Sequence, residues 1–189
     1  MLNNLEISST KNIVFLKNNI DGNEALEQTR VSCWRDNDSL YFEFCCDTSA
    51  EGYTSFGKNY NDKLWMGNVV EVFITLGDKK KYIEIETNPN GVNYAVKVDN
   101  KDGVGDFELT FLEEGQYLSM VAVNGKEWTT WIAMPIEKLE KLGFDKNNAF
   151  INMYRQSYID QNEPNLYAYS PTMLPKFHIC DAFAKLEIK

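Results

Sequence analysis

Hydrophobic and polar residues alternate in short runs along most of the chain, which is the pattern of half-buried β-strands. The clearest run is 39–47, in which every second residue from Leu40 to Cys46 is apolar, so that these side chains would share one face. Runs of this kind occupy Arg30–Arg35, Ser39–Asp47, Val69–Leu76, Lys81–Thr87, Val92–Val98, Tyr117–Val123, Thr129–Met134, Ala149–Gln156 and Ala182–Ile188. They predict a protein built mainly of strands.

Turn sequences join several of these runs closely enough for hairpins. Gly77-Asp78 separates the runs at 69–76 and 81–87, and Asn88–Gly91 separates the second of these from the run at 92–98. The three runs therefore predict an antiparallel meander.

Only one short helix is expected. Ile136, Leu139 and Leu142 follow one another at a spacing of three residues. Pro135 suits the first turn of a helix, and Gly143 would end it. One helix among eight or nine strands favours an all-β fold, an antiparallel β-sandwich of the jelly-roll or immunoglobulin-like kind, over alternating strand–helix units.

The composition fits a single globular domain covering residues 1–189. The chain has 43% hydrophobic and 13% aromatic residues. At this length it can bury a core without the help of a disulfide or a metal. None of the four cysteines belongs to a C-x-x-C pair, so we expect buried free thiols rather than zinc ligands.

The charge excludes some classes of partner. There are 19 basic and 28 acidic residues, which gives a net charge of −9, so a basic surface for nucleic acid or anionic membrane is not expected. No run approaches the roughly 18 apolar residues of a membrane span. Residues 1–10 contain no cationic segment followed by an apolar one, so no signal peptide is visible. We therefore expect a cytoplasmic protein unless a leader was removed.

Two long stretches, 48–64 and 157–175, are polar and aromatic with little alternation, and loops of this length are usually functional or disordered. Trp65 stands at the end of the first stretch, and Phe177 follows the second. Two aromatic rings on loops can hold a sugar ring between them, because the C–H faces of a pyranose pack against aromatic faces. Either ring could instead be an ordinary core residue.

Several segments together resemble carbohydrate-binding module family nine and its DOMON-like relatives, in an order and spacing that span roughly residues 20 to 189. In Trp65–Ile74 (WMGNVVEVFI), a Trp precedes a V-E-[IV]-F strand by the family's spacing. The other segments with this similarity are Thr29–Asp47, Lys81–Val92, Ile151–Gln156 and Tyr169–Leu186.

The resemblance implies a noncatalytic domain that binds a sugar or glycan end, in a carbohydrate catabolic context. In characterised modules two tryptophans hold a terminal sugar, and the corresponding residues here are Trp65 and Phe177. The family's Glu contacts sugar hydroxyls, which assigns that role to Glu71. Glu84 stands where the family has an Arg, and Arg155 lies on a different strand; both are candidate polar contacts.

Two other functions stay open. A DOMON-like relative could hold haem through His178, the only histidine, and a methionine such as Met66 or Met173. A glycoside hydrolase could use Glu84 and Glu86, which lie two apart on a strand and would therefore be about 7 Å apart, within the range of inverting enzymes. The same two carboxylates could instead belong to a solvated strand face, or to an acidic rim that accepts hydrogen bonds from hydroxyls.

A structural Ca²⁺ ion is the one cofactor that the sequence suggests. Members of the family often carry such an ion, which needs six to eight oxygen ligands. The acidic loops at 36–38, 99–106 and 160–163 could supply them. The alternative is that these residues accept hydrogen bonds from their own turns.

Overall fold

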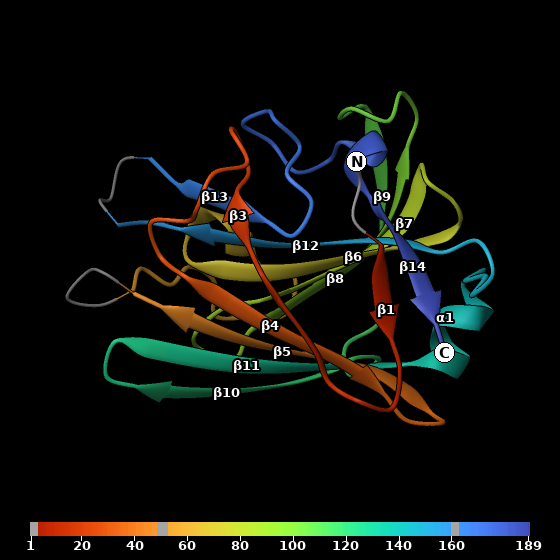
Figure 1. The fold of residues 1–189 in the computed structure, drawn as a ribbon, viewed down its shortest axis with the longest axis horizontal. Coiled ribbons are helices and arrows are strands. Elements are labelled where there is room, and N and C mark those ends of the chain that lie inside the picture. The colour runs from red at the N-terminus through yellow and green to blue at the C-terminus, as the bar shows by residue number, and fades with distance from the viewer. Residues whose placement is uncertain (1–3, 49–52, 160–162) are drawn as a thin grey trace.

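A computed structural model describes residues 4–48, 53–159 and 163–189, and shows two β-sheets packed face to face (Figure 1). The larger sheet contains β1 (Leu5–Ile7), β3 (Lys17–Asn18), β6 (Val69–Asp78), β7 (Lys81–Thr87), β8 (Asn93–Asn100), β9 (Phe107–Phe111), β12 (Phe150–Ser157), β13 (Asn165–Ala168) and β14 (Ala184–Ile188). The smaller sheet contains β2 (Asn12–Phe15), β4 (Thr29–Arg35), β5 (Ser39–Asp47), β10 (Leu118–Asn124) and β11 (Glu127–Pro135). The helix α1 (Ile136–Lys141) follows β11 directly.

The larger sheet runs β1-β14-β12-β6-β7-β8-β9, with β13 beside β12 and β3 beside β13. The smaller sheet runs β10-β11-β5-β4-β2. The predicted sandwich, the meander β6-β7-β8 and the single short helix are confirmed.

The main core lies between the two sheets. Alternate residues of β6, such as Val72, face the smaller sheet and meet residues such as Phe42 of β5 in one buried cluster. The intervening residues of β6, such as Phe73, face the other way into a second buried cluster with Tyr82 and Phe183. The larger sheet is therefore covered on both faces, and this second layer surrounds the candidate site.

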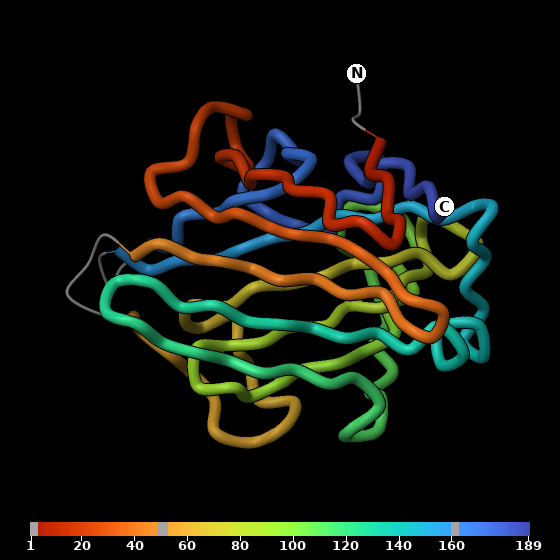
Figure 2. The backbone as a smooth tube through the Cα atoms, turned by 60° about the horizontal axis from the view of Figure 1, so that its bottom comes forward, coloured from red at the N-terminus to blue at the C-terminus, as the bar shows by residue number. Residues whose placement is uncertain are grey.

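The structure also contains strands that the alternation did not predict: β1, β2, β3, β9 and β13. β13 lies inside the stretch 157–175, which was expected to be loop, and it forms because β12 supplies hydrogen-bond partners along its edge. The sandwich is not wholly antiparallel either, since β1 pairs with β14 in parallel and brings the two terminal strands side by side (Figure 2). Strands of two to five residues have too few positions for alternation to reveal them.

The four cysteines are free and buried, as expected. Cys46 lies in the core between the sheets. No helix in the described part of the chain is long and apolar enough to cross a membrane.

Candidate functional site

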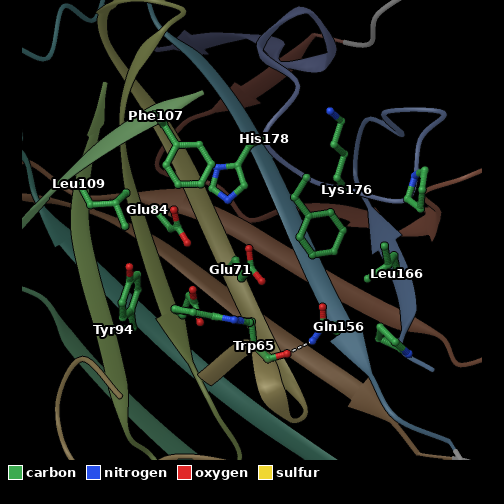
Figure 3. Close-up of a pocket in the computed structure, with 14 residues that line it drawn as sticks. Trp65, Glu71, Glu84, Tyr94, Phe107, Leu109, Gln156, Leu166, Lys176 and His178 are labelled. Carbon is green, nitrogen blue, oxygen red and sulfur yellow. Dashed lines mark hydrogen bonds between the residues drawn. The ribbon is translucent and has the colours of Figure 1, made fainter. Parts of the chain in front are cut away.

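A cavity of about 410 Å³ lies on the outer face of the larger sheet, the face turned away from the smaller sheet (Figure 3). Its floor consists of outward-facing residues of β6, β7 and β8. Its walls come from β9, β12 and β13, from the turn before β6 and from the segment before β14. The residues that line it are Trp65, Glu71, Glu84, Glu86, Tyr94, Phe107, Leu109, Gln156, Pro164, Leu166, Pro175, Lys176, Phe177 and His178.

Strand register brings the acidic residues of the floor together. Glu71 of β6 lies directly opposite Glu86 of β7, and Tyr154 and Tyr94 continue the same row onto β12 and β8. Glu84 belongs to the adjacent row of β7, on the same face as Glu86. Like charges directly opposite each other destabilise a sheet, so this arrangement is unusual for a purely structural surface.

The three carboxylates are almost completely buried and converge. Their exposed fractions are 3% for Glu71, 5% for Glu84 and 1% for Glu86, and one oxygen of each lies within 4.8 Å of the others. The second oxygen of Glu86, Oε2, has no hydrogen-bond partner. Burial and the neighbouring Glu84 raise the pKa of Glu71, and burial together with Glu71 and Glu84 raises the pKa of Glu86.

Aromatic rings form the walls above this floor. Trp65 lies in the short 3-10 turn Leu64–Met66, is 38% exposed, and meets Tyr94 edge-on with their ring centroids 5.3 Å apart. Phe177 is 7% exposed and stacks on Tyr154 with a centroid distance of 4.3 Å. The structure therefore brings the two aromatic residues expected from the sequence to one cavity, although Phe177 is much less exposed than Trp65.

Polar groups hold these walls in place. The side-chain amide of Gln156 on β12 donates a hydrogen bond to the backbone carbonyl of Trp65 (Figure 3). His178 shares a hydrogen bond of 2.7 Å with the hydroxyl of Tyr82 through Nδ1, and its ring lies 4.5 Å from that of Phe107. Burial lowers the pKa of His178, so its neutral form is favoured.

Arg155 lies outside the cavity, contrary to the expectation that it joins Glu71 and Glu84 there. It points from β12 into the space between the sheets, where its guanidinium donates to Glu27 Oε2 at 3.0 Å and to Thr29 Oγ1 at 3.0 Å. Its side chain is completely buried, so it connects the two sheets instead of reaching a ligand on the outer face. Neighbouring residues of a strand point to opposite faces, and Gln156 is the residue of this pair that reaches the cavity.

The structure also places the residues of the alternative functions. His178 lines the cavity, but neither Met66 nor Met173 is among its lining residues, and both methionines are exposed. The nearest oxygens of Glu84 and Glu86 are closer together than the 7 Å expected from strand spacing, because their side chains converge with that of Glu71.

The acidic loops considered for Ca²⁺ use their carboxylates within their own turns. Asp36 accepts hydrogen bonds from the backbone N–H groups of Asp38 and Ser39, and Asp102 accepts bonds from those of Val104, Gly105 and Asp106. Most of the third loop, residues 160–162, lies outside the described residues. The metal expectation gains no support from the two loops that are described.

Sequence reasoning missed several lining residues, including Tyr94, Gln156 and Phe107. For Gln156 a signal was available, because alternation along the 149–156 run places it on the face opposite Arg155. The sequence pairs Glu86 with Glu84, on one strand face, and not with Glu71. Its meeting with Glu71 depends on the register between β6 and β7, which shifts at an irregularity between Thr75 and Asp78.

Solved structures with this architecture include a carbohydrate-binding module. A family 9 carbohydrate-binding module from Caldicellulosiruptor kristjanssonii, solved with cellotriose and with glucose, superposes with a TM-score of 0.68 in both complexes at 7% identity. The superpositions cover 99% of this chain and 94% or 96% of the module. This chain has the family 9 module fold.

Two further relatives were found. A protein from Bacteroides uniformis, described as a candidate carbohydrate-binding protein, has the same fold, with a TM-score of 0.76 at 14% identity over 95% of this chain and 87% of its own. An extracellular protein of Arthroderma benhamiae is 24% identical over 173 residues, which is 84% of this chain and 78% of that protein. No family model matches the sequence.

Proposed function

We propose that this protein binds carbohydrate without converting it, and that a sugar ring occupies the cavity between Trp65 and Phe177. The observation that carries this proposal is the combination of aromatic walls and a floor of carboxylates in one cavity of about 410 Å³. Solved complexes of the family 9 module fold with glucose and cellotriose add support.

Each part of the cavity suits a different part of a sugar. The faces of Trp65 and Phe177 offer apolar surface to the C–H groups of a pyranose. A carboxyl group accepts hydrogen bonds through its oxygens in either protonation state, so Glu71 and Glu84 can hold hydroxyl donors. The exposed Trp65 forms the outer wall, and the more buried Phe177 forms the inner one.

The three acids converge more closely than the carboxyl groups of an inverting glycosidase, the kind of hydrolase considered for Glu84 and Glu86. An inverting glycosidase separates its two carboxyl groups by roughly 6.5–9.5 Å to admit a water molecule. Here the converging oxygens of the three glutamates lie within 4.8 Å of one another. They form a single acceptor cluster on one side of the cavity floor.

Replacing Trp65 by alanine tests the proposal. The Trp65→Ala variant should lose at least about tenfold in affinity for the sugars that the wild type binds, with wild-type Kd values of about 1 μM to 1 mM. Because the ring is 38% exposed, the free energy of unfolding should fall by well under the roughly 3–5 kcal/mol lost when a buried Trp is removed. Calorimetric titration with glucose, cellotriose and a wider glycan panel, with thermal melting of the same samples, measures both quantities.

Trp34→Ala is the matched control, because Trp34 stacks on Tyr41 in the smaller sheet, away from the cavity. This variant should keep the wild-type affinity. A stable Trp65→Ala protein with unchanged affinity would contradict the sugar position. A wild-type protein that binds no sugar of the panel would contradict the function itself.

A further inference from the structure

We propose that the floor of the cavity binds the protonated amine of an amino sugar, so that the preferred ligand is a cationic hexosamine or an oligosaccharide of such units. This inference rests on the proposed function and specifies its substrate class. Glu71, Glu84 and Glu86 carry it, together with the unpartnered buried oxygen of Glu86.

The three carboxylates have no cationic partner among the described residues. None of them takes part in a salt bridge there, although each is at least 95% buried. Oε2 of Glu86 is enclosed and accepts no hydrogen bond. A buried ionised carboxylate without a partner is strongly unfavourable, so a bound cation would supply what the chain itself does not.

The other charged and titratable groups around the floor do not supply a cationic partner for the three carboxylates either. Lys176 lines the cavity, but its Nζ donates to the backbone carbonyl of Val104 at 2.6 Å. Burial favours neutral His178, and its Nδ1 is engaged with the hydroxyl of Tyr82. The remaining titratable side chains that face this layer are Tyr82 on β7, Tyr94 on β8, Tyr154 on β12 and Cys180 before β14.

The spacing of the oxygens suits an ammonium group. Three acceptors placed about 2.8 Å from an ammonium nitrogen, along its tetrahedral N–H directions, lie roughly 4.6 Å from one another. The converging oxygens of the three glutamates fall within 4.8 Å of one another. Each of the three N–H groups of the ammonium can therefore donate a hydrogen bond to a different carboxylate.

The walls favour an organic cation over a bare metal ion. Trp65, Tyr94 and Phe107 present aromatic rings, which attract ammonium groups and pack against a sugar ring. A divalent cation such as Ca²⁺ requires six to eight oxygen ligands, and this mostly aromatic and apolar lining adds few oxygens to the three carboxylates.

Binding of the amine should also release protons. In the empty cavity the raised pKa values of Glu71 and Glu86 favour their protonated forms. An ammonium group stabilises the ionised forms, so protons leave to the solvent as the cation enters. Affinity for the amino sugar should therefore rise with pH until the amine itself loses its proton.

Calorimetric titration of the wild type with three matched sugars tests the inference. Glucosamine carries the cation, while glucose and N-acetylglucosamine are neutral controls of similar shape. We expect glucosamine to bind at least about tenfold more tightly than either neutral sugar. Its binding heat should depend on the ionisation enthalpy of the buffer, which reports the released protons.

The variants Glu86→Gln and Glu84→Gln should reduce this preference to within about threefold. Circular dichroism and melting curves establish that each is folded, and either one alone suffices if the other fails to fold. Glu43→Gln is the matched control, because Glu43 lies in the smaller sheet and accepts bonds from Lys11 and Trp131. It should keep the full preference for glucosamine.

The possible failures are distinguishable. Equal or tighter binding of glucose would overturn the amine assignment and leave the proposed function intact. Absence of binding to any sugar, neutral or amino, would overturn the proposed function together with the inference. Titration with Ca²⁺ alone tests whether the floor is a metal site instead. The inference would be overturned if Ca²⁺ bound tightly, if Glu86→Gln abolished that binding, and if the wild type showed no preference for glucosamine.

Discussion

At the scale of single residues, the floor of the cavity holds a group of acids whose burial is energetically unfavourable. Glu71 and Glu86 are buried directly opposite each other, and Glu84 adds a third carboxylate within reach. Burial and mutual repulsion disfavour their ionised forms. Strongly perturbed acids in a cleft are typical of functional sites, where stability is sacrificed for chemistry.

We predict that Glu86→Gln stabilises the ligand-free protein at neutral pH. The pKa of Glu86 is raised on folding, so the folded state holds its proton more tightly and the wild type loses stability as the pH rises through that pKa. Below the unfolded value of about 4.3 the group is protonated in both states, and the gain should vanish. A gain of about 1 kcal/mol at pH 7 would raise Tm by roughly 2–4 °C in a chain of this size.

Thermal melting of both proteins between pH 4 and pH 8 measures this difference. Glu43→Gln should behave in the opposite way and lower Tm at pH 7, because it removes the negative charge that pairs with Lys11 and one of the two oxygens that accept bonds from Lys11 and Trp131. A Tm difference for Glu86→Gln that stays constant over the whole pH range would contradict the assigned cause.

At the scale of elements, β12 serves both layers of the molecule. Its residues Tyr154 and Gln156 face the cavity layer, whereas Arg155 between them points into the space between the sheets. There it reaches Glu27, the backbone carbonyl of Asp47 at 2.7 Å and Thr29. One strand thus positions a wall of the site and ties the larger sheet to the smaller one.

Arg155→Met should therefore destabilise the fold without acting on the ligand directly. Removing one partner of a buried ion pair leaves the other charge without compensation, which costs about 3–5 kcal/mol. Denaturant unfolding measures the loss. Because Arg155 pairs directly with Glu27, the double variant Arg155→Met with Glu27→Gln removes both charges of the pair and should recover part of the loss. A loss of sugar affinity in a fully folded Arg155→Met protein would contradict a purely structural role for this residue.

At the scale of the whole molecule, the buried cluster between the sheets joins them into one body. It contains residues of both, such as Val72 of β6 and Phe42 of β5. Trp128, on β11 of the smaller sheet, is completely buried in the same cluster. Neither sheet can lose its partner without exposing this apolar surface, so the two should unfold together.

We predict a single cooperative transition on heating. Tryptophan fluorescence follows mainly the smaller sheet, which carries Trp34, Trp128 and Trp131, while the near-UV signal of tyrosines such as Tyr82 and Tyr154 follows the larger one. The two melting curves should coincide, with a heat-capacity change of about 2.3–2.8 kcal/mol/K. Two separate transitions would show that the sheets form independent units.

A saturating ligand should move both curves by the same amount. Binding at 100 times Kd adds about 2.7 kcal/mol to the free energy of unfolding. A sugar that shifted only the tyrosine curve would contradict the single cooperative unit.

The sequence by itself determined most strands and the class of the fold. Alternation is a local property, so runs such as 39–47 and 81–87 could be assigned without knowing their partners. The same property placed Glu84 and Glu86 on one face, and the spacing of Trp65 before Glu71 placed both near the start of β6. The short strands β3 and β13 could not be predicted from the sequence, because they form through hydrogen bonds to strands that are distant in the chain.

Only the tertiary structure decided which of these residues meet. Alternation says that two residues share a face, but not which face is covered by the other sheet and which opens into a cavity. Because the smaller sheet covers one face of β12, Arg155 points between the sheets and pairs with Glu27, whereas Gln156 lies on the other face beside Trp65. The register between β6 and β7, which shifts at the irregularity between Thr75 and Asp78, sets Glu71 opposite Glu86 and so creates the acidic floor.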